Sequence, residues 1–167
     1  MMYIGTLIKE MIAYNAADPR RVHHLLKVYG FAKAIGELEG LDAQTQQILE
    51  IAALTHDIGI RNSERKYGSA AGSHQEVEGP PEAKALLQAL SVDPAAIERV
   101  CWLIGHHHTY TDISGMDYQI LVEADFLVNA MEGEMSREAI DSVARKIFKT
   151  QSGSRFLRLQ YLQDKPE

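Results

Sequence analysis

The sequence predicts an all-α protein, and three observations support this. Apolar residues recur at helical spacing along most of the 167-residue chain. No segment alternates apolar and polar residues with the period of a β-strand. Asp18-Pro19 and Asp93-Pro94 each combine a preferred N-cap residue with proline at the first helical position, which is typical of helix starts. We therefore expect a compact bundle of about seven or eight helices.

The expected helices follow one another along the chain with one long interruption. They cover residues 5–15, 18–39, 42–56, 80–90, 93–104 and 117–132, followed by a seventh helix from the Ser136 cap and a last short helix over 156–162. Residues 58–79 carry glycines and serines among basic residues and predict a loop, and Pro80-Pro81 predicts the start of the next helix. A loop of that length inside a compact domain is often functional.

Composition predicts one domain and excludes some partners. With 46% hydrophobic and 24% charged residues, the chain is long enough for one compact domain over residues 1–167 and short for two. The net charge of −6 argues against general binding to nucleic acid or anionic membranes, although a local basic pocket can still bind a small phosphorylated molecule. Cys101 is the only cysteine, so no internal disulfide can form. Because no signal-peptide pattern or transmembrane-length segment is found, we expect a cytoplasmic protein.

Helical geometry separates the adjacent histidines at positions 23 and 24. At about 100° per residue, His24 shares the apolar face of its helix with Val28 and Ile35, whereas His23 lies beside Lys27. His24 is therefore expected to point into the protein. A lone inward histidine is more often a hydrogen-bonded core residue than a metal ligand, so this position alone does not indicate a metal.

The stretch "LTHDIG" places His56 and Asp57 together at the end of an apolar helix. A buried imidazole and a buried carboxylate each cost free energy unless something pairs with them. One explanation is that the two residues hydrogen-bond to and cap one another. The other explanation is a bound metal ion.

Further polar groups interrupt apolar surfaces later in the chain. The expected helix over 117–132 is apolar almost all round, which is typical of a buried helix, yet it contains Glu123 and Asp125. His107 falls on the apolar face of the preceding helix, and His108 lies at its edge. Asp125 alone could pair with an arginine, and His107 alone could be a helix-end histidine favoured by the helix dipole. Four helices nevertheless each direct an imidazole or a carboxylate inward, and together they favour a central metal site.

The ligand types narrow the choice of metal. Imidazole nitrogens mixed with carboxylate oxygens, without a cysteine cluster, suit Fe, Mn, Co, Ni or catalytic Zn better than structural zinc or calcium, and Mg is also compatible. Such sites keep open coordination positions. A metal with open positions lowers the pKa of a bound water and polarises a phosphoryl oxygen, which hydrolysis at neutral pH requires.

The order of these residues resembles the HD superfamily of metal-dependent phosphohydrolases, whose name comes from the adjacent His-Asp pair. Four segments carry the resemblance, over about residues 20–129: "HLLKVYGFA", "AALTHDIG", "VCWLIGHHH" and "ILVEADFL". The resemblance implies a bundle of helices around a site with one or two metal ions. It also implies that the ligands of the first ion are His24, His56, Asp57 and Asp125.

One branch of the superfamily does not fit. The branch that acts on cyclic dinucleotides, the HD-GYP branch, has a lysine after the HDIG run and a glycine-tyrosine-proline motif after the paired histidines. Here those places hold Ile60 and "HTYTDISG". We therefore expect a member outside that branch.

A second ion has several candidate ligands. Many two-metal members have a histidine before the glycine that opens the next helix, and here His74 lies one residue further from Gly79 than the usual spacing. His74 with His107 is one way to hold a second ion, and His74 could equally be a solvated loop histidine. His108 and Glu78 are further candidates, either as ligands of that ion or as groups behind its ligands.

The expected reaction is hydrolysis of a phosphate ester or anhydride in a small metabolite, with a nucleotide as the first candidate. His56 and Asp57 are expected to carry catalysis, in which a water on the ion, deprotonated with help from Asp57, attacks phosphorus. The residues expected to bind the substrate phosphate are Arg61, Arg65 and Lys66, and Arg20 and Arg21 are the next candidates. Each of the first three could instead belong to a solvated basic loop.

Two other functions stay open at this point. Some members of the superfamily use a pair of irons to activate oxygen, so a di-iron oxygenase is the alternative enzyme. A non-catalytic sensor that binds metal or a nucleotide is the third candidate. The C-terminal helices over 134–167 lie outside the recognisable core and are candidates for shaping the pocket or a homodimer surface.

Overall fold

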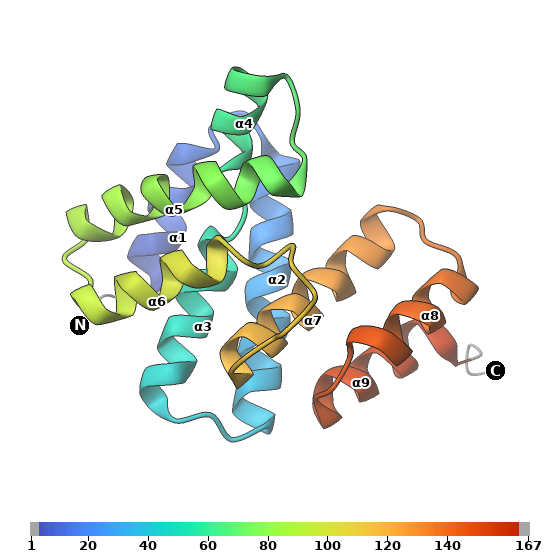
Figure 1. Ribbon diagram of the computed structural model, residues 1–167. Helices are drawn as coiled ribbons and strands as arrows, with labels where there is room; N and C mark the ends of the chain where they lie inside the picture. The colour runs from blue at the N-terminus through green and yellow to red at the C-terminus, as the bar shows by residue number, and fades with distance from the viewer. Residues whose placement is uncertain (1–3, 164–167) are drawn as a thin grey trace.

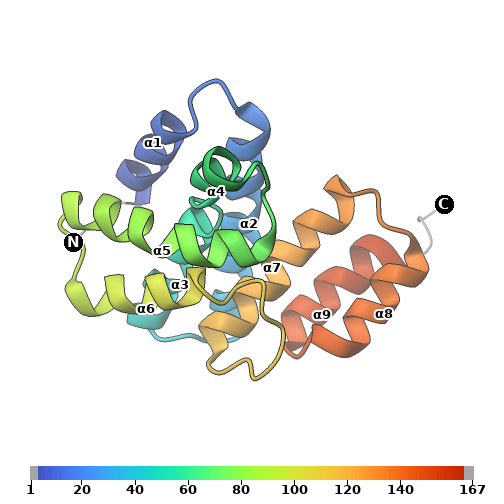
Figure 2. The ribbon, with the colours of Figure 1, turned by 45° about the horizontal axis from the view of Figure 1, so that its top comes forward.

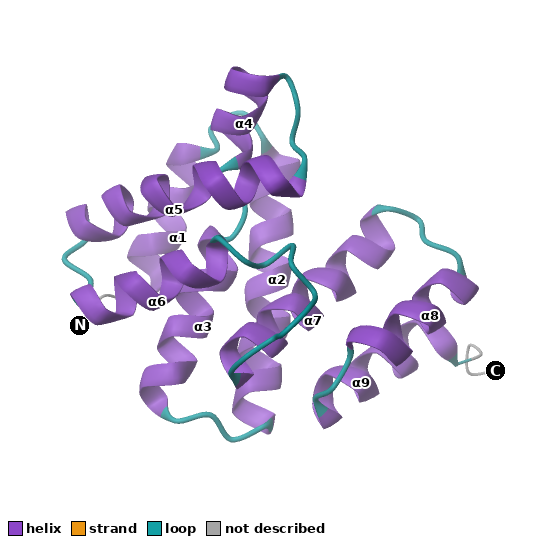
Figure 3. Cartoon of the chain, viewed as in Figure 1, coloured by secondary structure: helices purple, strands orange, loops and turns teal. Residues whose placement is uncertain are grey.

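A computed structural model describes residues 4–163, and within that range every regular element is a helix (Figure 3). The all-α prediction is confirmed. The elements are α1 Ile4–Tyr14, α2 Pro19–Leu38, α3 Ala43–Thr55, α4 Ile60–Tyr67, α5 Gly72–Ala89, α6 Pro94–Ile104, α7 Met116–Glu132, α8 Arg137–Ile147, α9 Gln151–Leu157 and a π-helical turn η1 Arg158–Leu162. Residues 1–3 and 164–167, at the ends of the predicted domain, lie outside the described residues. No helix among residues 4–163 is long and apolar enough to cross a membrane.

The helix starts predicted from the sequence are found where side chains cap them. Asp18 accepts a hydrogen bond from the Arg21 backbone at the start of α2, and Asp93 accepts two from the first turn of α6. Asp42 and Ser136 cap α3 and α8 in the same way. Each cap satisfies backbone N–H groups that the helix itself leaves unpaired.

Helix α3 lies in the middle of the molecule and is buried over its second half. All residues from Ile48 to Thr55 are buried, including Leu49 and Ile51 with no exposed surface. Helices α1, α2, α6 and α7 pack around α3, as Figure 1 shows. The C-terminal end of α3, with the His-Asp pair, is therefore held inside the bundle.

The predicted loop over 58–79 is wrong, because most of this segment forms α4 and the first part of α5. The glycines that indicated a loop allow close packing between segments. A Cβ atom on Gly59 would lie 2.6 Å from the Gly79 backbone nitrogen, and one on Gly79 would lie 2.6 Å from Ile104 Cγ2. These glycines therefore let α5 lie directly against the start of α4 and against α6.

The predicted helix start at Pro80-Pro81 is also wrong, since both prolines lie inside α5. Proline has no N–H, so these residues leave carbonyl groups one turn earlier without their helical partners. Such a position costs free energy and is rarely expected from sequence alone. In this protein the helix continues through the prolines while packing along α6.

The C-terminal helices α8 and α9 lie together beside α7, away from α5 and α6, in both views of the chain (Figures 1 and 2). Aromatic pairs join them to the rest of the bundle. Phe31 of α2 lies 6.4 Å from Phe156, and Phe126 of α7 lies 5.8 Å from Phe148, between ring centroids. The short expected helix over 156–162 is observed as the end of α9 and the π-helical turn.

Glu123 connects α7 to the segment between α8 and α9. Its side chain has no exposed surface, and its Oε1 atom accepts hydrogen bonds from the backbone nitrogens of Lys149 (2.7 Å) and Thr150 (2.9 Å). Gln119 and the Thr150 hydroxyl donate to the same carboxylate. Of the two acidic residues that interrupt the apolar α7, Glu123 is therefore satisfied by protein donors alone.

We expect the Glu123→Ala variant to lose about 3 kcal/mol of unfolding free energy, because it leaves buried backbone donors without an acceptor. Urea unfolding followed by circular dichroism measures this loss. Metal affinity of the folded variant should stay at the wild-type value, because both oxygens of the Glu123 carboxylate already accept hydrogen bonds from protein donors. A stability within 0.5 kcal/mol of wild type, a spread of about the size seen at exposed surface sites, would contradict this role.

Candidate metal centre

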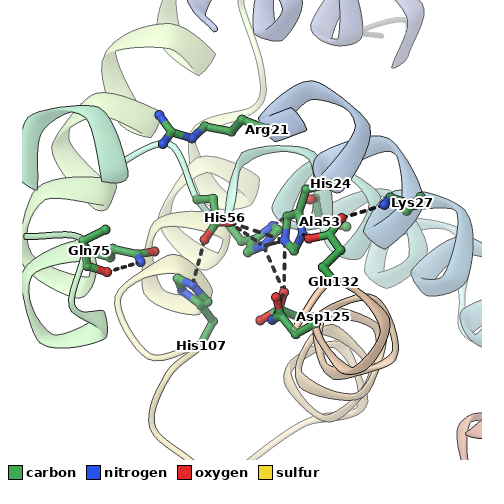
Figure 4. A network of polar contacts seen from close by, with 12 residues as sticks. Arg21, His24, Lys27, Ala53, His56, Gln75, His107, Asp125 and Glu132 are labelled. Carbon is green, nitrogen blue, oxygen red and sulfur yellow. Dashed lines mark hydrogen bonds and ion pairs between the residues drawn. The ribbon is translucent and has the colours of Figure 1, made fainter. Parts of the chain in front are cut away.

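Residues from separate helices converge inside the bundle, as Figure 4 shows. His24 comes from the second turn of α2, His56 caps the C-terminal end of α3, and Asp125 comes from the middle of α7. His23 is exposed, whereas His24 is only 7% exposed, as the helical face predicted. Asp57 follows His56 and completes the group.

Four donor atoms at the centre lie at nearly equal separations. His24 Nε2 is 3.3 Å from His56 Nε2, 3.4 Å from Asp57 Oδ2 and 3.2 Å from Asp125 Oδ1. His56 Nε2 is 3.5 Å from the Asp57 oxygen and 3.4 Å from the Asp125 oxygen. Each of the two carboxylate oxygens therefore lies within 3.5 Å of both imidazole nitrogens, and His24, His56 and Asp57 form one group of potential metal ligands.

These separations fit a shared metal ion. Nitrogen and oxygen ligands lie about 2.1 Å from a transition metal, which separates neighbouring ligands by about 3.0–3.4 Å at right or tetrahedral angles. The observed separations of 3.2–3.5 Å are close to that range. Two imidazoles and two carboxylates also form the mixed nitrogen and oxygen donor set that suits Fe, Mn, Co, Ni or catalytic Zn.

Each histidine at the centre is oriented by a hydrogen bond at its other nitrogen. His56 Nδ1 lies 2.9 Å from the Ala53 carbonyl oxygen, and His107 Nδ1 lies 2.7 Å from the Ile104 carbonyl oxygen. A carbonyl only accepts, so Nδ1 of both rings must carry the proton. In the neutral form of each ring, Nε2 then carries a lone pair directed at the centre, as in metal-binding histidines.

His107 shows the clearest unmet requirement for a ligand. Its side chain is 1% exposed, and Nε2 has no hydrogen-bond partner. This atom lies 3.6 Å from Asp57 Oδ1, the carboxylate oxygen that does not face His24 and His56. Asp57, His107 and His108 form a second group of potential metal ligands, so Asp57 belongs to both groups. A buried unpaired nitrogen is costly, and an ion on this side would satisfy it.

Charges at the centre shift its pKa values. Burial raises the pKa of Asp57, but the charge of His56 and the nearby His107 ring, 3.6 Å away, outweigh burial and lower that pKa to about 2. Burial also opposes ionisation of Asp125, yet hydrogen bonds from His24 and His56 hold its pKa well below the usual value. Burial lowers the pKa of His56, but the Asp57 charge and the Asp125 hydrogen bond raise it to about 9. In the metal-free protein the protonated His56 ring therefore attracts the ionised carboxylates of Asp57 and Asp125.

His108 differs from His56 in its charge. Burial and the neighbouring His107 charge lower the pKa of His108 to about 4, so its ring is neutral at pH 7. His108 Nε2 lies 3.1 Å from Gln75 Oε1, and Glu76 accepts a hydrogen bond from the His108 backbone. A neutral imidazole can bind a metal without first losing a proton.

The other two candidates for a second ion, His74 and Glu78, contact residues of α4, and His74 Nδ1 is buried without a hydrogen-bond partner. His74 stacks on Tyr67 with ring centroids 4.2 Å apart and belongs to neither group of potential ligands. Glu78 accepts hydrogen bonds from Lys66 (2.6 Å) and Tyr67 (3.0 Å). Its carboxylate therefore joins α4 to α5.

The three basic residues expected to bind phosphate lie on α4 and contact other groups. Arg61 donates to the Tyr14 carbonyl oxygen at 3.2 Å, and Arg65 donates to Asn62 at 2.9 Å. None of the three lines the cleft of about 300 Å³ that reaches the centre, whose walls are Asp18, Arg20, Arg21, His24, Asp57, Ile60, Asn129 and Glu132. Arg20 and Arg21 are the basic residues of that cleft.

Sequence patterns did not reveal Glu132, which contacts His24 of the centre, or Lys27, which contacts Glu132. Glu132 Oε2 lies 2.8 Å from His24 Nδ1, and Glu132 Oε1 lies 2.6 Å from Lys27 Nζ. Glu132 follows Asp125 by seven residues, about two turns of α7, so the two residues lie on the same helix face, and this spacing could have indicated Glu132. Its partner on α2 could not be identified from spacing, since 108 residues separate the two.

Comparison with known families identifies the fold around this centre. The HD domain model matches residues 21–149. The chain belongs to the HD domain family. The match to this HD domain includes α8, beyond the segment over 20–129 that carried the resemblance in the sequence.

A solved structure is also similar to this HD domain. It is the crystal structure of a predicted HD superfamily hydrolase from an uncultured Thermotogales bacterium, with a TM-score of 0.65 and 26% sequence identity. The alignment covers 95% of this chain and 83% of that chain. A comparison with curated proteins finds no match. The predicted family is therefore confirmed.

Proposed function

We propose that this HD domain is a metal-dependent phosphohydrolase that acts on a small phosphate ester or anhydride, with nucleotides as the first substrates to test. One observation carries the proposal: His24, His56 and Asp57 form a group of potential metal ligands, and Asp125 Oδ1 lies within 3.4 Å of both imidazole nitrogens of that group. The cleft of about 300 Å³ reaches this group through His24 and Asp57. A substrate in the cleft would therefore meet the ligands of the ion directly.

Four residues would bind the first ion, and one of them would also accept a proton from the attacking water. His24, His56, Asp57 and Asp125 would hold the first ion, which when bound activates water and polarises a phosphoryl oxygen. Asp57 is the ligand with the most exposed side chain of the four, at 13%. Its carboxylate is ionised at neutral pH and can accept a proton from the attacking water.

Arg21 and Arg20 are proposed to bind the substrate phosphate. Arg21 lies in the first turn of α2 and is held by Glu64 of α4, with 3.4 Å between Arg21 Nη2 and Glu64 Oε1. Figure 4 shows Arg21 above the centre, with no dashed line to His24, His56 or Asp125. An arginine suits this role because its planar guanidinium can donate two hydrogen bonds to one phosphate group.

The variant Arg21→Ala is expected to raise KM for a phosphate substrate about tenfold or more, because it removes a charge-assisted hydrogen bond. Steady-state kinetics of phosphate release measures this change, and the exposed Arg145→Ala variant is the control. The sequence-based proposal for Arg61, Arg65 and Lys66 makes the opposite prediction. If alanine at one of those three positions raises KM more than Arg21→Ala does, phosphate binds at α4 and our assignment to α2 is wrong.

The proposed activity is tested with protein stripped of metal and then reloaded. Metal content is first measured in protein purified without added metal. Stripped protein is then loaded with Fe²⁺, Mn²⁺, Co²⁺, Ni²⁺, Zn²⁺ or Mg²⁺ and assayed for release of phosphate or pyrophosphate from a panel of nucleotides and simple phosphomonoesters. We expect release with at least one loaded form and none from the stripped form. Equal release from both forms would contradict a metal-dependent reaction.

A second ion is proposed at Asp57, His107 and His108, on the evidence of the unpaired His107 nitrogen. Two close ions would serve hydrolysis by binding both the attacking and the leaving oxygen. The same pair, if both ions are iron, is the basis of the alternative function as an oxygenase. Oxygen consumption by the iron-loaded protein without phosphate release would favour that alternative.

A further inference from the structure

Glu132 and Lys27 form a polar contact at the His24 nitrogen that does not face the other donors, and Glu132 also lines the cleft that reaches the centre. Glu132 lies in the last turn of α7, and its side chain is 17% exposed. Its two oxygens contact different partners on α2, at 2.8 Å from His24 Nδ1 and 2.6 Å from Lys27 Nζ. Figure 4 shows Glu132 between these two side chains.

His24 is oriented in a different way from the other histidines of the centre. His56 and His107 donate from Nδ1 to backbone carbonyls three residues earlier in their own segments. Those contacts are set by local backbone structure. His24 lies in the second turn of α2, where the backbone carbonyls are already used by the helix, and its Nδ1 instead contacts a carboxylate from α7.

This difference has a chemical consequence. A carboxylate that accepts the Nδ1 proton fixes the ring orientation and makes Nε2 a stronger electron donor than a carbonyl contact does. Because Glu132 has a second oxygen bound to Lys27, the carboxylate is held by two contacts in one position. Asp125 lies on the same helix as Glu132 and faces His24 Nε2 at 3.2 Å. Helix α7 therefore contacts both nitrogens of the same ring.

We propose that Glu132 is a positioning residue for metal binding, and that Lys27 holds it in place. Glu132 accepts the Nδ1 proton of His24 and thereby directs Nε2 toward the ion. The proposal rests on the proposed metal site, but it makes a separate claim about which residues outside the ligand group set metal affinity.

The test is the affinity of the stripped protein for Zn²⁺ and Co²⁺, measured by competition with a chromophoric chelator. We expect Glu132→Ala to weaken binding by about 10- to 100-fold. Glu132→Gln should fall between this variant and wild type, because the amide oxygen still accepts a hydrogen bond but carries no charge. Lys27→Met should also weaken binding, by less than Glu132→Ala. The visible spectrum of the Co²⁺ form should change in Glu132→Ala, since the His24 ligand is no longer held.

Glu50 supplies a matched control. It is 7% exposed and, like Glu132, pairs with a lysine of α2, with 3.1 Å between Lys33 Nζ and Glu50 Oε1. Its other hydrogen-bonded partner is Gln46, so it does not orient a histidine. Glu50→Ala should lower thermal stability while leaving metal affinity and the Co²⁺ spectrum at wild-type values. Circular dichroism confirms that each variant is folded before titration.

Two outcomes overturn the proposal. One is a metal affinity within twofold of wild type in both Glu132 variants, together with an unchanged Co²⁺ spectrum. The other is an equal loss of affinity in Glu50→Ala, which would mean that any buried Lys-Glu pair on α2 acts through stability. Failure of the proposed function is seen separately, as wild-type protein that binds metal but releases no phosphate from the substrate panel.

Discussion

Substituting either residue of the His-Asp pair, as His56→Ala or Asp57→Ala, is expected to abolish binding of the first ion and to lower phosphate release at least ~100-fold, the size of loss that follows removal of one strong electrostatic contact in a transition state. His56 is fully buried, and both residues lie within 3.5 Å of the other donors. The two variants therefore remove donors that no nearby side chain can replace. Metal content by mass spectrometry and steady-state phosphate release measure the two effects.

His106→Ala is the control for this prediction. His106 lies one residue before His107, but its ring stacks on Trp102 and its Nδ1 lies 2.7 Å from the Trp102 carbonyl oxygen. It belongs to neither group of potential ligands, so metal content and kcat should stay close to wild type. If His106→Ala lost as much metal as His56→Ala, or if the Asp57 variant retained full activity, the assigned centre would be wrong.

The second large effect is the dependence of metal binding on pH. The pKa of His56 is raised from 6.5 to about 9 in the metal-free protein, because the charge of Asp57 and the Asp125 hydrogen bond outweigh burial. At pH 7 the ring is protonated, and an ion must displace that proton to bind Nε2. Affinity should therefore rise about tenfold per pH unit between pH 7 and 9 for this proton alone. Calorimetric titration in two buffers of different ionisation enthalpy measures the released proton.

The same shift has an opposite effect on the stability of the metal-free protein. A folded-state pKa above the unfolded value stabilises the fold fully below pH 6.5, and this contribution is lost as pH rises through about 9. We expect the unfolding free energy of the metal-free protein to decrease over that range. The unfolding free energy of the metal-loaded protein should not show this decrease. Metal affinity that is independent of pH between 7 and 9, with no proton released, would contradict the charged state of His56.

Several elements of the site were predictable because they depend on local sequence. The inward position of His24 follows from the helical face that it shares with buried Val28 and Ile35. The end of α3 at the His-Asp pair and the buried α7 around Asp125 follow from their apolar composition in the same way. A period of 3.6 residues is sufficient for each of these predictions, because each requires knowledge of only one helix.

The parts that the sequence did not reveal depend on contacts between distant segments. Gly59 and Gly79 resemble loop glycines until the two backbones are seen in contact. Once α4 is a helix, it directs Arg61 to the Tyr14 carbonyl and Lys66 to Glu78, away from the cleft. Tertiary packing overrides weak local preferences in this way, and contacts between distant segments leave no periodic pattern in the sequence.

The most direct test of the metal centre is anomalous X-ray diffraction from crystals of the loaded protein, with data collected on both sides of the absorption edge of the metal. We predict a peak between His24 Nε2, His56 Nε2, Asp57 Oδ2 and Asp125 Oδ1, bonded to all four atoms. A fully loaded and active crystal with its anomalous peak elsewhere, or with no peak among these four residues, would contradict the proposed centre.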